Sequence, residues 1–86
     1  VSCTDTVSSM RLDCVVSAVC GVSRNTATEL VENSKVSVNS LICEKITKTL
    51  NDGDVLTIRG KGKFYLISSS EHTKKGRIIL CYNKYK

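Results

Sequence analysis

Two arginines stand at the expected starts of helices, where a cation is electrostatically disfavoured. Arg24 directly follows Ser23, the predicted N-cap of one helix, and Arg11 falls in the first turn expected for another. The positive end of a helix dipole opposes a cation there by about 0.3 to 1 kcal/mol, while free backbone N–H groups at a helix start attract anions. Ser23, Arg24 and Asn25 therefore form a candidate phosphate site. The alternative is that both arginines simply point into solvent.

A second basic stretch, IRGKGKF, combines two glycines with Arg59, Lys61 and Lys63 beside an aromatic residue. It lacks the GxxxxGK[ST] spacing of a nucleotide-binding loop, and it precedes an expected strand rather than a helix whose start could hold phosphate. We therefore expect Gly60 and Gly62 to bend the sheet, and the three cations to flank the same anion-binding surface.

The sequence contains no recognisable catalytic or metal-binding pattern. His72 is the single histidine and is tied to no acid or nucleophile by a motif. Asp52 and Asp54 flank Gly53 in the manner of a tight turn. We expect no enzyme activity, no cofactor, no metal and no small-molecule substrate. Reduced thiols, rather than zinc ligands or disulfides, are expected for the five cysteines, which stand at positions 3, 14, 20, 43 and 81.

The net charge of +5 over 86 residues is unevenly placed. Residues 1–50 balance, whereas residues 51–86 carry the whole surplus. Such asymmetry favours a polyanionic partner, with nucleic acid ahead of an anionic membrane surface, and a solvated basic surface without a partner as the alternative. No apolar run approaches the roughly 20 residues of a membrane span, and the first ten residues do not resemble a signal peptide. We expect a cytoplasmic protein.

Residue spacing predicts two short helices followed by strands. Apolar residues recur at helical spacing in 11–20 and 23–34, with Ser9 and Ser23 as expected N-caps and Gly21 closing the first helix. Strands and an edge segment are expected at 36–38, 41–43 and 55–59, and a long hairpin is expected from 64–68 and 77–85. Helices followed by strands indicate an α+β fold.

The chain length fits one small domain. We expect residues 1–10 to be a lead-in or linker and residues 11–86 to form the domain, with a core motif at 11–60 and a basic hairpin at 61–86. Because the first residue is Val, the chain is expected to be either a processed start or a fragment of a longer protein.

Two long patterns in the chain resemble a known family. RLDxVVxxVxxVSRxxAxELVExxKVxVN at 11–39 and GDVLTIRGKGKF at 53–64 resemble the S4 RNA-binding domain of a ribosomal small-subunit protein, pseudouridine synthases and tyrosyl-tRNA synthetases. RGKGKF, HTKKGR and the closing NKYK are similar more narrowly to the C-terminal S4 domain of the YlmH, or photosystem II S4-like, family. The resemblance then covers nearly the whole chain.

The resemblance implies an S4-type αL motif: two N-terminal helices on a small, twisted, mainly antiparallel sheet with a C-terminal β-hairpin. It implies a monomeric RNA-binding module. Because full-length YlmH proteins associate with large-subunit complexes holding obstructed peptidyl-tRNA, the implied partner is structured rRNA or tRNA. The RNA-contacting positions would be Arg11, Ser23, Arg24, Asn25, Lys35 and Asn39, joined by the basic residues Arg59, Lys61, Lys63, Lys74, Lys75 and Arg77.

The chain departs from the S4 pattern at two turns. Ser34 and Ser40 stand where glycine is common, so either Asn33 adopts the left-handed conformation or the turns accept strain of roughly 1 kcal/mol. Thr26 and Thr28 replace lysines found in many relatives, which leaves Arg24 and Lys35 as the main cations of the core motif.

Several readings of the surface stay open. Duplex RNA would be recognised through backbone shape, 2′-hydroxyls and phosphates. Phe64, Tyr65, Tyr82 and Tyr85 either stack on single-stranded bases or belong to the core and the sheet faces. The rival functions are a protein-interaction module and the RNA-positioning appendage of an RNA-modifying enzyme whose catalytic domain is absent.

Overall fold

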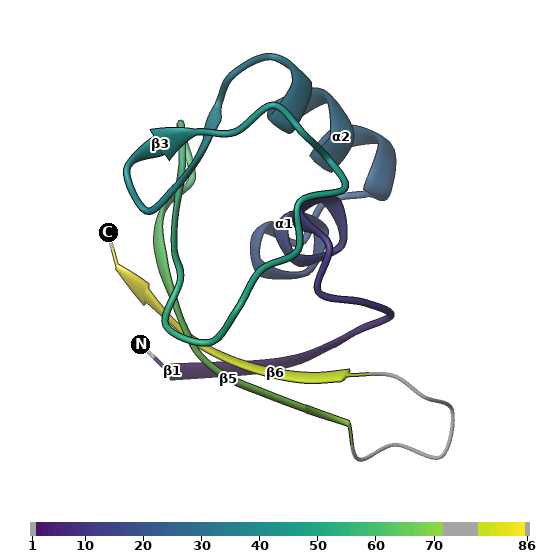
Figure 1. Cartoon of the computed structure of the whole chain (residues 1–86), viewed down its shortest axis with the longest axis vertical. Coiled ribbons are helices and arrows are strands. Elements are labelled where there is room, and N and C mark those ends of the chain that lie inside the picture. The colour runs from purple at the N-terminus through teal and green to yellow at the C-terminus, as the bar shows by residue number, and fades with distance from the viewer. Residues whose placement is uncertain (1, 72–77, 86) are drawn as a thin grey trace.

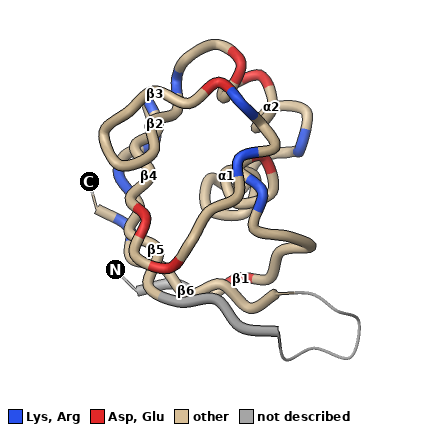
Figure 2. Tube along the Cα trace, in the orientation of Figure 1, with Lys and Arg blue, Asp and Glu red and all other residues tan. Residues whose placement is uncertain are grey.

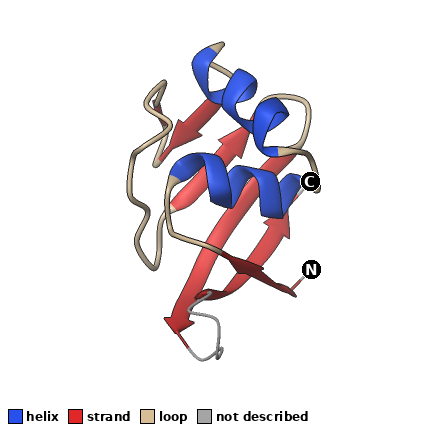
Figure 3. Cartoon of the chain, turned by 90° about the vertical axis from the view of Figure 1, so that its right-hand side faces the viewer, coloured by secondary structure: helices blue, strands red, loops and turns tan. Residues whose placement is uncertain are grey.

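A computed structural model describes the chain at residues 2–71 and 78–85. Both helices it contains lie on one face of a strongly curved sheet (Figures 1 and 3), which confirms the α+β prediction. The sheet has the strand order β1-β6-β5-β4-β2-β3 with antiparallel neighbours throughout. The elements are β1 (Ser2–Val7), α1 (Leu12–Cys20), α2 (Arg24–Glu32), β2 (Val36–Val38), β3 (Leu41–Ile42), β4 (Val55–Ile58), β5 (Gly62–Glu71) and β6 (Ile78–Tyr85).

The first residues are part of the sheet, which corrects the expected lead-in. β1 pairs with β6 from Ser2↔Asn83 to Val7↔Ile78 and forms one edge of the sheet. Val7 is buried in the core. The segment SCTDTV has a single core-facing aliphatic residue and no apolar alternation, so its strand character depends on threonines and on pairing with a distant strand. The structured domain therefore includes residues 2–10.

The two helices begin in different ways. Ser23 is the N-cap of α2, as predicted, and its Oγ accepts a hydrogen bond from Thr26 N at 3.2 Å. The predicted N-cap Ser9 is wrong for α1, because the N-cap position is Arg11 and no side chain caps the helix. Backbone carbonyls of the 46–48 segment cap it instead: Leu12 N donates to Lys48 O at 2.8 Å and Asp13 N donates to Ile46 O at 3.4 Å. These acceptors come from a distant loop.

The core lies between the helices and the inner face of the sheet. Leu12, Val15, Val16 and Val31 of the helices are fully buried against inward strand residues. In β5, the buried Phe64 and Leu66 alternate with exposed neighbours, so β5 has one face toward the helices and one away from them. The rings of Phe64 and Tyr82 meet edge to face at 6.1 Å. Cys14, Cys20, Cys43 and Cys81 are free thiols, and Cys14 is buried.

The IRGKGKF stretch forms the tight turn between β4 and β5. Lys61 N donates to Ile58 O at 3.0 Å, and Gly60 at φ 83° supplies the positive φ of a type II turn. Gly60 therefore lies in a chain reversal between two neighbouring strands and Gly62 begins β5, so neither glycine bends one continuous sheet surface. β5 and β6 pair antiparallel, and the segment expected to join them as a hairpin, 72–77, lies outside the described residues. Among the described helices, none is long and apolar enough to cross a membrane.

Ser34 and Ser40, which stand where the S4 pattern commonly has glycine, both adopt a left-handed backbone conformation. Ser34 adopts φ 61°, whereas Asn33 remains at φ −93°. Asn39 at φ 52° and Ser40 at φ 72° form the two-residue turn between β2 and β3, and two positive φ angles are typical of a type I′ hairpin turn. Ser34 and Ser40 thus occupy a left-handed conformation that costs about 1 to 2 kcal/mol each, whereas asparagine tolerates it.

Replacing Ser40 by glycine should stabilise the domain. Glycine removes the left-handed strain but loses more backbone entropy on folding, which leaves a net gain of about 0.5 to 1 kcal/mol in the free energy of unfolding. Urea unfolding followed by circular dichroism measures this. Ser34→Gly is the matched control, since it relieves similar strain but loses the 2.7 Å bond from Ser34 Oγ to Glu44 Oε2, and should stabilise less. Destabilisation by Ser40→Gly would contradict a strained turn.

Candidate functional site

A buried carboxylate in the first turn of α1 holds both arginines. Asp13 is 2% exposed, and its Oδ2 lies 3.0 Å from Arg24 Nη2 while its Oδ1 lies 3.5 Å from Arg11 Nε. Oδ1 also accepts a hydrogen bond from Cys14 N at 2.9 Å. Asp13 therefore pairs with both arginines, which offsets the unfavourable position of a cation at a helix start.

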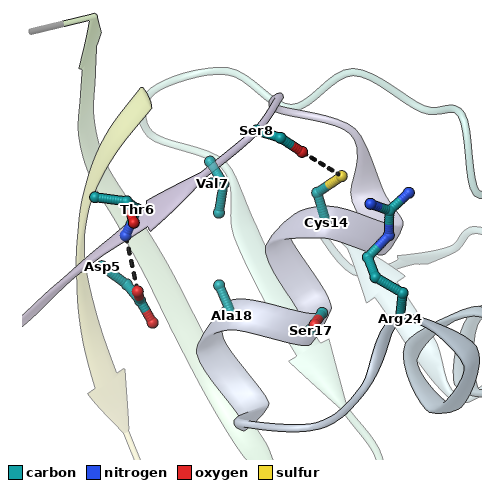
Figure 4. A pocket seen from close by; sticks show the side chains of 8 residues that line it. All are labelled: Asp5, Thr6, Val7, Ser8, Cys14, Ser17, Ala18 and Arg24. Atoms are coloured by element: carbon teal, nitrogen blue, oxygen red, sulfur yellow. Dashed lines mark hydrogen bonds between the residues drawn. The ribbon is translucent and has the colours of Figure 1, made fainter. Parts of the chain in front are cut away.

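The pairing fixes Arg24 while leaving it accessible. Its side chain is 54% exposed, compared with 42% for Arg11. The hydrogen bond to Asp13 is the main reason that the pKa of the Arg24 guanidinium is raised above its usual value, so the group stays charged. Arg24 reaches from the start of α2 toward α1 (Figure 4). Two arginines share one carboxylate, which leaves this cluster with a net positive charge.

Arg24 also lines a hollow of about 230 Å³ between β1 and α1. Figure 4 shows this hollow with Asp5, Val7 and Ser8 of the β1 side facing Cys14 and Ala18 of α1. The carboxylate of Asp5 lies in the lining, and its Oδ1 accepts a hydrogen bond from Thr6 N at 2.8 Å. Asp5 and Arg24 place opposite charges in the lining, so the hollow favours an anion less than the exposed start of α2 does. The exposed start of α2 remains the candidate.

At the start of α2, the predicted site residues lie together on the surface. Ser23, Arg24 and Asn25 are all exposed. The Ser23 hydroxyl is engaged with Thr26, accepting from its N–H and donating to its Oγ1 at 3.0 Å. Helix geometry leaves the N–H groups of the first turn without intrahelical acceptors, so those of Arg24 and Asn25 are available to a ligand. α1 differs, since carbonyls of the 46–48 segment cover its start.

A second basic group gathers at one end of the sheet. Arg59 N donates to Lys35 O at 2.8 Å, which places Lys35 beside the β4–β5 turn that carries Arg59 and Lys61. Burial raises the pKa of the Cys20 thiol. The nearby charges of Lys61 and Lys84 oppose this shift but are outweighed by it. Cys20 therefore stays a neutral thiol near physiological pH, and no thiolate offsets the charge of these lysines.

Two predicted contact residues have other positions or partners. Lys63 alternates with the buried Phe64, so it projects from the face of the sheet opposite the helices and does not share a surface with Arg24. Asn39 has a structural role: its Oδ1 accepts from Val55 N at 3.0 Å, and its Nδ2 donates to Asp54 Oδ1 at 3.1 Å. Basic positions occur both near the helices and along the strands (Figure 2). The remaining predicted residues, Lys74, Lys75 and Arg77, lie outside the described part of the chain, as does His72.

The fold and the site define a small α+β domain with a basic, exposed helix start. No family model matches the chain. The chain is 37% identical over 82 residues, 95% of its length, to a curated Bacillus subtilis (strain 168) protein named ribosome-associated protein quality control protein P2. It spans only 32% of that relative's length. The chain therefore has a ribosome-associated homologue, and the similarity covers about one third of that homologue's length.

Proposed function

We propose that this domain is an S4-type module that binds structured RNA, either rRNA or tRNA, through phosphate and shape contacts. The observation that carries the proposal is Arg24, charged and exposed at the start of α2 but oriented by the buried Asp13. The name of the homologue supports a ribosome-linked role. We extend the proposal to a monomeric, cytoplasmic, non-catalytic module acting on the large ribosomal subunit.

The geometry suits phosphate recognition for two physical reasons. A guanidinium donates paired N–H bonds that match the oxygens of a phosphate, and Asp13 holds that guanidinium so that less side-chain entropy is lost on binding. The N–H groups of Arg24 and Asn25 add the attraction of a helix start for anions. Lys35, Arg59 and Lys61 supply a second group of positive charges for a ligand as large as an RNA helix.

Arg24→Gln should weaken binding to a labelled RNA hairpin or tRNA by about tenfold at moderate salt. It should also reduce the slope of log affinity against log salt by about one, because one fewer phosphate is neutralised. Fluorescence anisotropy at several salt concentrations measures both quantities, and circular dichroism establishes that the variant is folded. Arg24→Lys keeps the charge without the paired donors, so its RNA affinity should lie between those of Arg24→Gln and the original protein.

Lys63→Gln is the matched control for this measurement. It removes the same charge, but from the sheet face opposite the helices, so affinity for the RNA hairpin and the salt slope should stay nearly unchanged. Equal losses in Arg24→Gln and Lys63→Gln would indicate nonspecific attraction by net charge. Failure of the unsubstituted domain to bind any structured RNA would overturn the proposal.

A protein-binding role is the second candidate, and it is favoured by one surface. Leu41 is 74% exposed and Ile42 is 64% exposed on the short edge strand β3. Exposed aliphatic residues at a sheet edge are typical of a protein contact. A complex through β3 would be insensitive to salt and would be lost in Leu41→Ser with RNA affinity intact. The appendage of an RNA-modifying enzyme stays a further proposal, since only one third of the homologue is covered.

A further inference from the structure

The face of the sheet that points away from the helices carries two exposed aromatic rings. Tyr65 of β5 is 37% exposed and Tyr85 of β6 is 48% exposed. Both helices lie on the other face of the sheet (Figure 3). Phe64 and Tyr82, the other aromatic residues, are buried in the core. Of the four rings, two therefore belong to the core and two lie on an open surface.

Strand register assembles these tyrosines into one compact group. Lys63 is paired directly with Tyr85, and Tyr65 is paired directly with Asn83. Because residues two apart in a strand share a face, all four side chains project from the same side of the sheet. The two tyrosines occupy diagonal positions, about 7 to 8 Å apart by ordinary sheet geometry, so each ring can contact a different flat group. We call these four residues the tyrosine platform.

The chemistry of the tyrosine platform fits unpaired nucleotides. Aromatic rings stack on bases irrespective of their sequence, and a nearby cation attracts the phosphate backbone. Lys63 lies within the platform, Arg59 and Lys61 lie in the turn that precedes β5, and the Asn83 amide offers both a donor and an acceptor to a base edge. Among residues 55–58, 62–67 and 78–85 of β4, β5 and β6, none that faces this side is acidic. This charge pattern favours an anion.

We propose that the tyrosine platform binds unpaired nucleotides of a single-stranded RNA segment. The inference deepens the proposed function and rests on it for the class of ligand, but it concerns the opposite face of the sheet. A structured RNA would then contact the helix side of the domain through its duplex, while a single-stranded extension of that RNA, which a short closed hairpin lacks, reaches the outer face. Lys63, which lies on the other face of the sheet from the α2 site, would attract the phosphates of that single strand.

The test compares an oligo(U) single strand with an RNA hairpin, using the full chain and fluorescence anisotropy. Tyr65→Ala and Tyr85→Ala should each weaken binding of oligo(U) by about tenfold and leave hairpin affinity unchanged. Tyr65→Phe and Tyr85→Phe retain the stacking surface and should bind nearly as well as the original protein. Thr57→Ala, a non-aromatic change next to Lys63 in β4, is the control on the same face.

Arg24→Gln separates this inference from the proposed function, because it should weaken hairpin binding much more than oligo(U) binding. If the tyrosine variants bind oligo(U) as tightly as the original protein, the inference is overturned while hairpin binding can still support the proposed function. It is also overturned if oligo(U) does not bind, or if sedimentation shows that the platform is covered in a dimer that Tyr65→Ala dissociates. If neither RNA binds, both proposals fail.

Discussion

Asp13→Ala should lower the free energy of unfolding by about 2 to 3 kcal/mol, because one small carboxylate serves three partners. The carboxylate is buried and interacts with Arg24, Arg11 and the N–H of Cys14. Hydrogen bonds to charged groups contribute about 1.5 to 3 kcal/mol, and an anion in the first turn of a helix adds about 0.3 to 1 kcal/mol. Thermal unfolding should show a midpoint lowered by about 10 to 20 °C.

Asp5→Ala is the matched control for the Asp13 substitution. Asp5 also accepts a hydrogen bond from the next residue's N–H, at 2.8 Å, but it is exposed, and none of the arginines within residues 2–71 is paired with it. Substitution of an exposed residue of this kind changes stability by about 0.5 kcal/mol or less. Similar losses in the two variants would show that the arginine pairing contributes little, and would contradict the orientation of Arg24 by Asp13.

The Asp13 substitution also separates the stability of the site from its charge. Asp13→Ala leaves two arginines without a carboxylate, so the local positive charge rises while the position of Arg24 is no longer fixed. We expect steeper salt dependence of RNA binding, with less discrimination between an RNA hairpin and a random single strand. Anisotropy titrations at temperatures where the variant is fully folded would show this change.

Local patterns were enough to predict the elements whose boundaries depend on local chemistry. Ser23 caps α2 through its own hydroxyl, and Gly21 ends α1 at φ 67°, both as the residue types indicate. Elements determined by distant contacts were missed. β1 depends on pairing with β6, and the start of α1 depends on carbonyls of residues 46 and 48, so neither could be derived from neighbouring residues.

The candidate site shows the same division. The exposure of Ser23, Arg24 and Asn25 was predictable, because the start of an amphipathic helix is a surface position. The ion pair between Asp13 and Arg24 joins two helices across eleven residues, and a single sequence gives no sign of it beyond a charged residue among buried ones. The position of Lys63 on the opposite face could have been predicted from its alternation with Phe64. It was not, because Lys63 was grouped with the glycine-rich turn rather than with the strand.

Gly62→Ala, at the start of β5, should be more destabilising than Gly60→Ala in the β4–β5 turn. A Cβ built on Gly62 would lie 2.8 Å from the backbone oxygen of Tyr85, and Gly62 adopts φ 113°. The side chain cannot avoid a carbonyl of the neighbouring strand, so the end of β6 must move. Backbone strain of about 1 to 3 kcal/mol and overpacking of about 1 to 3 kcal/mol together predict a loss of about 3 kcal/mol in the free energy of unfolding.

Gly60→Ala separates the two causes of this loss. Gly60 has a similarly positive φ of 83°, but an added Cβ would meet nothing within 4 Å, so only backbone strain of about 1 to 2 kcal/mol applies. Urea unfolding should therefore rank Gly62→Ala below Gly60→Ala in stability. Equal losses would show that contact with Tyr85 is relieved at no cost. Because Tyr85 pairs with Lys63, a shift of β6 in Gly62→Ala should also weaken oligo(U) binding, whereas Gly60→Ala should leave the tyrosine platform in place.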